Sequence, residues 1–211
     1  MQICKQFSSI KNIKKNKLNF IIIFKNSAFL TILMDFVLKK ELENSNLDYV
    51  DLITAKNSSE LRKKIDSKQG LRIIRGGNDE INRTALENKR TDILLGPEYN
   101  REKDFIHFRN SGLNHILCHL AKKNEAAIGF NFSDLMNSRN KEIVLGRMMQ
   151  NVFLCRKFKV KMILGSFATK ENEIKNRSEL MSFGKVLGMN GKEIKDGLNF
   201  KKKEEKIKIL K

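Results

Sequence analysis

The chain alternates short runs of β-branched and aliphatic residues with longer segments whose apolar residues recur at helical spacing. Residues 141–158, for example, place Leu145, Met148 and Val152 on one helical face. This alternation is typical of parallel strands joined by crossover helices, so it predicts an α/β fold. The expected strands are 20–24, 49–55, 71–75, 92–95, 126–130 and 161–164, and the expected helices are 58–67, 78–88, 112–124 and 141–158.

Glycine or proline follows several of the expected strands, at Gly76, Gly96, Pro97 and Gly165. These positions place strand-to-helix loops at the carboxyl ends of the strands, where α/β proteins usually build their sites. Periodicity alone leaves two architectures open, because an open doubly wound sheet and a closed barrel produce the same pattern.

The chain divides into an N-terminal segment at 1–45, a body at 46–199 and a basic, charge-dense tail at 200–211. The first segment has a basic stretch followed by apolar residues, which superficially resembles a signal peptide or membrane anchor. Lys25 and Asp35 interrupt it, and a spanning helix needs about 20 nearly uncharged apolar residues. We therefore expect a first strand and helix there, and no membrane association.

The charge balance points to a polyanionic partner. The 211 residues contain 42 lysines and arginines against 24 acidic residues, a formal net charge of +18. Nucleic acid is the first candidate and an anionic membrane the second, while a lysine-rich composition with a solvated surface is the alternative. The basic runs at 5–17, 139–161 and in the tail suit docking on a structured RNA through its phosphates and shape.

The three cysteines, Cys4, Cys118 and Cys155, are widely separated and lack CxxC spacing. Neither a disulfide framework nor a cysteine zinc knuckle is indicated, and reduced thiols fit a cytoplasmic protein. Cys118 and Cys155 lie in helical apolar patterns, so both are expected in the core.

The strand ends carry few metal ligands. Glu98 is the one good hard-metal ligand among the residues expected there, which are Thr54, Arg75, Glu98, Asn131 and Ser166. Two-metal phosphoryl chemistry needs several converging carboxylates or histidines. His115 and His119 are four apart on an expected helix, but the glutamate of HExxH is missing, which favours a packed pair over zinc. We predict no catalytic residue and no metal on the protein.

Gly76 and Gly77 could bring the backbone close to a phosphate at the start of the following helix, with Arg75 adding charge. The motifs GxxxxGK and GxGxxG are both absent, so a tight strand-to-helix turn is the alternative and no nucleotide cofactor is predicted. Asn78 and Asp79 are candidate caps for that helix.

Residues 75–101, RGGNDEINRTALENKRTDILLGPEYNR, and 111–136, SGLNHILCHLAKKNEAAIGFNFSDLM, carry a family resemblance. The pieces GG, NR, LEN, DIL, PE, R and SGLNH come in order, followed by a strand ending in FN and later by SFA and IKN before a terminal helix. Over residues 70–190 this set resembles archaeal ribonuclease P protein component 3, the homologue of the thirty-kilodalton subunit of the eukaryotic enzyme.

The resemblance implies a TIM-barrel-like β/α barrel, related to the PHP phosphoesterases but without their metal cluster. It also implies a subunit that is inactive alone. The partner RNA would carry the magnesium and cleave the 5′ leader from precursor tRNA, while this protein pairs with a small protein subunit and supports the RNA. The alternative hypothesis is a metal-dependent PHP-like phosphoesterase.

Two segments depart from the family pattern. The first 45 residues do not match its opening strand and helix, and the loop at 103–110 is longer than usual. The candidate contacts to RNA or to a partner are Arg75, Arg83, Arg101, Arg109, Lys170 and Arg177, and a solvated charge is the alternative for each.

Overall fold

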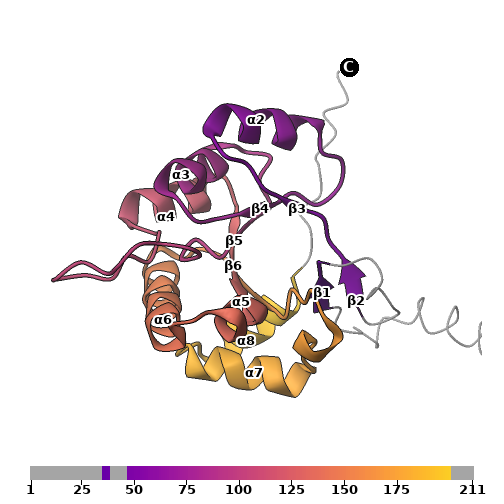
Figure 1. Ribbon diagram of the computed structural model, residues 1–211, viewed down its shortest axis with the longest axis vertical. Helices are drawn as coiled ribbons and strands as arrows, with labels where there is room; N and C mark the ends of the chain where they lie inside the picture. The colour runs from indigo at the N-terminus through magenta and orange to yellow at the C-terminus, as the bar shows by residue number, and fades with distance from the viewer. Residues whose placement is uncertain (1–34, 39–46, 201–211) are drawn as a thin grey trace, which may run out of the picture. The chain divides into compact units, whose positions relative to one another are not determined.

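The structure, a computed structural model, describes residues 35–38 and 47–200 (Figure 1). Its main sheet is parallel throughout, and its strands pair in the order in which they occur along the chain. A second, two-stranded parallel pair is formed by β1 (Asp35–Val37) and β2 (Leu47–Tyr49). The main sheet consists of β3 (Leu52–Ile53), β4 (Ile73–Arg75), β5 (Ile93–Leu95), β6 (Ala127–Asn131) and β7 (Met162–Gly165).

Backbone pairing closes the two sheets into one ring. On one side, β2 continues into β3 after two residues, and the Val50 N–H donates to the Val37 carbonyl at 2.9 Å. On the other side, Val37 forms a parallel bridge to Ala168, just beyond β7, and the Leu38 N–H donates to the Ala168 carbonyl at 2.9 Å. The fold is therefore a TIM-barrel-like β/α barrel, as the resemblance implied, and not an open sheet. Its described part has fewer strand positions than the eight of a full TIM barrel.

The barrel interior is filled by alternate residues of the strands. The interior cluster contains Ile73, Ile93, Leu95, Ala127 and Ile163 from the strands, with Val50 and Phe167 from adjoining segments. Side chains alternate across a strand, so the residues between them point outward, where they are equally buried. Gly129 also faces the barrel interior. A Cβ there would lie 2.8 Å from Leu95 Cδ1, so the Leu95 side chain already fills the space beside Gly129.

An asparagine is the N-cap of every α-helix in the described part of the chain. The side chains of Asn57, Asn78, Asn114 and Asn131 each accept a backbone hydrogen bond from the first turn of the following helix. Because Asn78 and Asn114 are caps, the helices expected at 78–88 and 112–124 begin slightly later than expected. The helices are α2 (Ser58–Ser67), α3 (Asp79–Glu87), α4 (His115–Lys123), α5 (Phe132–Asn137), α6 (Lys141–Phe158), α7 (Arg177–Val186) and α8 (Gly191–Leu198), with a 3-10 turn at Glu171–Glu173.

The helices expected at 58–67 and 141–158 are confirmed residue for residue. The strands expected at 71–75 and 92–95 are present but begin later, and those expected at 126–130 and 161–164 are shifted by one residue. The strand expected at 49–55 is divided between β2 and β3, and the strand expected at 20–24 lies outside the described residues. The expectations for 1–45 and for the tail likewise fall largely outside the described residues and stay predictions. No helix in the described part of the chain is long and apolar enough to cross a membrane.

Cys118 and Cys155 lie in the core, as expected, and both are free thiols. Burial raises the pKa of the Cys118 thiol to about 11. Burial also raises the pKa of Cys155 well above its ordinary value. Both side chains therefore act as small buried apolar groups, because a thiol needs its thiolate form to react.

Candidate functional site

The carboxyl ends of β4 and β6 are joined by a largely buried ion pair. Arg75, the last residue of β4, donates from both terminal nitrogens to the two carboxylate oxygens of Asp134 at 2.6 Å each. The Arg75 guanidinium carbon also lies 3.5 Å from the ring centroid of Tyr99. Barrel enzymes place their catalytic groups at this end of the strands. Here an ion pair and an aromatic ring occupy the same position.

A second buried polar pair joins the segment that follows β5 to α6. Glu98 Oε2 accepts from the Asn151 side-chain amide at 2.9 Å, and both residues are almost completely buried. Glu98 Oε1 and Asn151 Oδ1 are buried without a hydrogen-bond partner among the described residues. Burial is the largest of several influences on Glu98, and together they raise the pKa of its carboxyl to about 7. Glu98 is therefore a carboxyl that changes charge near neutral pH.

The long β5–α4 loop, residues 96–114, is fixed at its base by a buried asparagine. The Asn82 side-chain amide of α3 donates to the Pro97 and Gly112 carbonyls at 3.1 Å each, which ties the two ends of the loop together. Gly112 has a φ of +76°, and a Cβ there would overlap the Pro97 carbonyl. Gly76 similarly packs so closely on Pro97 that a Cβ would lie 2.8 Å from its Cα, which supports the tight-turn interpretation of the GG pair.

Two arginines hold the middle of the loop. Arg101 donates to Asn110 Oδ1 at 2.6 Å and to Asp79 at 2.8 Å, and it also bonds the Gly77 carbonyl. Arg147 reaches the loop from α6. It donates to Asp104 Oδ1 at 2.7 Å and to the carbonyls of two loop residues, with only 4% of its surface exposed. Asp104 Oδ1 also accepts from the Asn110 N–H at 2.9 Å, so the carboxylate joins both sides of the loop.

The tip of this loop, residues 105–108, carries exposed apolar side chains. Phe105 is 55% exposed, Ile106 95% and Phe108 61%. The rings of Phe105 and Phe108 stack with centroids 4.5 Å apart, and the Phe105 N–H donates to the Phe108 carbonyl at 3.0 Å. The tip is therefore a defined turn, and Figure 1 shows its segment extending away from the helices.

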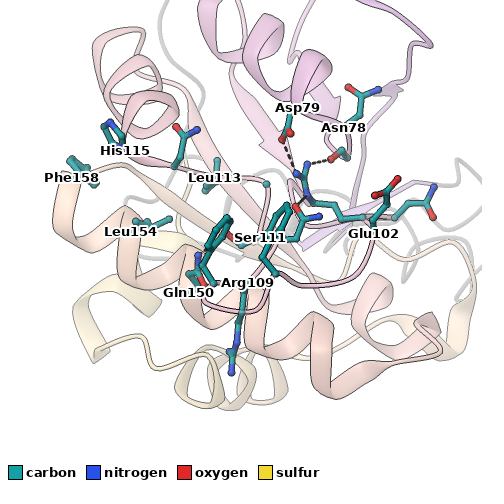
Figure 2. Close-up of a pocket in the computed structure, with 18 of the residues that line it drawn as sticks. Asn78, Asp79, Glu102, Arg109, Ser111, Leu113, His115, Gln150, Leu154 and Phe158 are labelled. Carbon is teal, nitrogen blue, oxygen red and sulfur yellow. Dashed lines mark hydrogen bonds and ion pairs between the residues drawn. The ribbon is translucent and has the colours of Figure 1, made fainter.

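A groove of about 880 Å³ lies beside the tip. Phe105, Phe108 and Arg109 form the loop side, and the starts of α3 and α4 contribute further lining residues. Figure 2 shows Gln150, Leu154 and Phe158 of α6 along this groove, with His115 at the start of α4. Lys157 adds a positive charge on the α6 side. The groove therefore combines aromatic rings, amides and cations.

The six candidate contact residues fall into two groups. Arg75 and Arg101 are held in the internal bonds described above, whereas the other four candidates are exposed: Arg83, Arg109, Lys170 and Arg177. Arg83 pairs with Glu87 at 2.8 Å within α3. The Arg109 guanidinium lies against Gly146 of α6, where a Cβ would be 2.3 Å from Nη1. Of the six candidates, only Arg101 and Arg109 border the large groove.

The two histidines of α4 are not brought to a metal-ligand cluster. His119 packs edge-on against Phe158 with ring centroids 4.9 Å apart, and His115 borders the groove. Within the described ranges, no group of three or more His, Cys, Asp or Glu side chains is placed to hold a metal ion.

Sequence reasoning missed the polar side chains of the loop base. Their spacing could have indicated them. Arg147 and Asn151 are four residues apart, so they share one helical face, and buried apolar neighbours such as Met148 lie beside it. The tip was signalled by FIHF, an apolar run between charged residues in a segment with no periodicity. Nothing local pointed to Asp134 as the partner of Arg75.

Comparisons with known proteins place the chain in a family. Residues 46–204 match the family model of the RNase P subunit p30. Ribonuclease P protein component 3 of Methanosarcina mazei is 33% identical over 64% of this chain and 54% of its own length. The same component of Methanococcus vannielii is 32% identical over 72% of this chain and 65% of its own length. The matched region thus spans little more than half of several such relatives.

A solved structure agrees with these matches. A chain in the cryo-EM structure of archaeal ribonuclease P with mature tRNA superposes with a TM-score of 0.62 and 26% sequence identity, covering 77% of this chain and 75% of that chain. Fold and site together define a basic β/α barrel protein whose strand ends are occupied by internal ion pairs and hydrogen bonds. The chain belongs to the RNase P subunit p30 family.

Proposed function

We propose that this chain is a protein subunit of ribonuclease P that supports the catalytic RNA when it removes the 5′ leader from precursor tRNA. The observation that carries the proposal is the family match over residues 46–204, joined to the likeness to a chain within archaeal ribonuclease P. The formal charge of +18 supports a role beside RNA, since phosphate neutralisation supplies much of the affinity for nucleic acids.

The proposed partners are the catalytic RNA, the precursor tRNA and other ribonuclease P protein subunits, one small subunit being paired directly with this chain. The magnesium of the reaction would be bound by the RNA, and the complex would act in the cytoplasm. The arrangement at the carboxyl end of the barrel supports a non-catalytic role, because Asp134 is bonded by both arms of the Arg75 guanidinium.

Cleavage of precursor tRNA by the cognate catalytic RNA, at moderate magnesium and with the other protein subunits present, tests the proposal. Adding this protein should raise the cleavage rate, and the protein without RNA should release no product. A matched reaction with heat-denatured protein controls for charge alone. If a folded preparation leaves the rate unchanged, the proposal is wrong. Phosphoester turnover by the protein and a metal without RNA would instead favour a PHP-like phosphoesterase.

A further inference from the structure

The tip of the β5–α4 loop exposes more apolar surface than its own fold requires. Phe105, Ile106 and Phe108 are exposed side by side, and the base of the loop is fixed by hydrogen bonds that hold the tip in place. Contiguous exposed apolar groups on a defined turn usually mark a contact site. Two of these side chains also line the groove of about 880 Å³.

We propose that this groove binds unstacked nucleotides of a single-stranded RNA segment, with the ring of Phe105 or Phe108 stacked on a base. Lys157, which lines the groove, then neutralises a neighbouring phosphate. The proposal rests on the proposed function, because it specifies one contact of a subunit that works beside RNA.

The chemistry of the groove favours RNA over a protein helix as the occupant. A base offers an apolar face to aromatic rings and polar edges to amides, and the groove provides both, with amides on Asn78, Asn114 and Gln150. Two carboxylates line the groove: Asp79, which pairs with Arg101, and Glu102, which Figure 2 shows at the end away from Phe158. The exposed cation Lys157 is next to Phe158 in the chain, so phosphate is expected at that end. The N-terminal ends of α3 and α4 border the same space, and helix N-termini favour anions.

Fluorescence anisotropy of the full chain with a labelled oligouridine, and with an RNA duplex as the second probe, tests the stacking. The double variant Phe105→Ala/Phe108→Ala should bind oligouridine about tenfold more weakly, the loss expected when one base loses its aromatic partner. Duplex binding should be unchanged, because paired bases are not available for stacking. An equal loss for both probes, or no loss for either, overturns the proposal.

Phe153→Ala is the matched control, since Phe153 of α6 is also 61% exposed but does not line the groove. It should leave oligouridine affinity unchanged. Lys157→Gln should lower the slope of log affinity against log salt by about 0.7, the contribution of one phosphate contact on a single strand. The double phenylalanine variant should keep the wild-type slope. Equal weakening by Phe153→Ala would show that any exposed aromatic residue suffices, which also overturns the proposal.

A photo-reactive group attached through Ile106→Cys, in a Cys4→Ser background, identifies the occupant in the reconstituted ribonuclease P complex. Cross-links should map to unpaired positions of an RNA. Cross-links to a protein subunit would overturn the proposal and assign the tip to a protein interface. The cleavage assay separates the two levels: wild-type protein that fails to stimulate cleavage defeats the proposed function, whereas stimulation without RNA cross-links defeats only this inference.

Discussion

At the base of the β5–α4 loop polar and charged side chains are buried, whereas at its tip apolar side chains face solvent. Glu98 of the loop and its α6 neighbours Arg147 and Asn151 are each at most 4% exposed, whereas Ile106 at the tip is 95% exposed. Folded proteins usually have the opposite distribution. The base of the loop therefore resembles a buried polar core, whereas its tip resembles an exposed apolar surface.

The difference shows what each part contributes. Buried polar groups destabilise a protein unless they are paired, but their hydrogen bonds are directional and fix one geometry. Arg147 and Asn82 thus define where the loop leaves the barrel. Exposed phenylalanines add little to the stability of the chain alone, so their value lies in contact with a partner. The base fixes the position of the loop, and the tip is the part that would contact the proposed RNA partner.

The largest expected effect is at the base. Arg147→Met should lower the free energy of unfolding by about 3 to 5 kcal/mol, because it removes a buried guanidinium from its ion pair with Asp104 and leaves two loop carbonyls without that donor. Asp104 keeps its bond from the Asn110 N–H. Urea denaturation at neutral pH measures this loss.

Arg83→Met is the matched control for this substitution. Arg83 also lies on a helix and pairs with a carboxylate, but its side chain is 63% exposed. Its loss should cost less than about 0.5 kcal/mol. Equal losses at the two positions would show that burial at the loop base is not what distinguishes Arg147.

Glu98→Gln should change how stability depends on pH. The folded-state pKa of Glu98 is raised to about 7, so its favourable contribution is complete below the ordinary value of 4.5 and is lost as the pH rises through 7. The variant is neutral throughout and should be about 3 kcal/mol more stable than the wild type at pH 8, with the difference vanishing at acid pH. Denaturation of both proteins between pH 4 and 8 measures this.

Glu80→Gln gives a control of opposite sign. Hydrogen bonding to Ser58 lowers the pKa of Glu80, so that glutamate stabilises the fold above its unfolded-state pKa and the stabilisation is lost as the pH falls. Its variant should be the less stable protein at neutral pH and should match the wild type at low pH. If Glu98→Gln showed this second pattern, the buried carboxyl would be charged at neutral pH.

Much of the fold could be predicted from the sequence because its signals are local. Apolar periodicity located α2 and α6 to the residue, and short β-branched runs located β4 to β7. Ring closure was not local, since it depends on Val37 meeting Ala168, residues far apart along the chain. Only the family resemblance favoured the barrel over an open sheet.

The candidate site was less accessible to prediction. Sequence reasoning selected arginines for their charge, but charge does not reveal whether an arginine already forms an ion pair with a carboxylate of the same chain. Arg75 pairs with Asp134, and Arg101 pairs with Asp79, each across a long stretch of chain, so both guanidinium groups are largely covered by partners within the protein. Arg147 was passed over because its neighbours are apolar, and it is the arginine that holds the loop. A tertiary contact decides each of these cases.

The smallest expected effect on stability is at the tip. Phe105→Ala/Phe108→Ala should change the free energy of unfolding by no more than about 0.5 kcal/mol per residue, because both side chains are already more than half exposed. Phe130→Ala, at a fully buried ring of β6, should cost about 3 to 5 kcal/mol in the same urea titration. A large loss at the tip would mean that the stacked rings support the loop themselves. A small loss combined with weakened oligouridine binding would separate the binding role of the tip from the positioning role of the base.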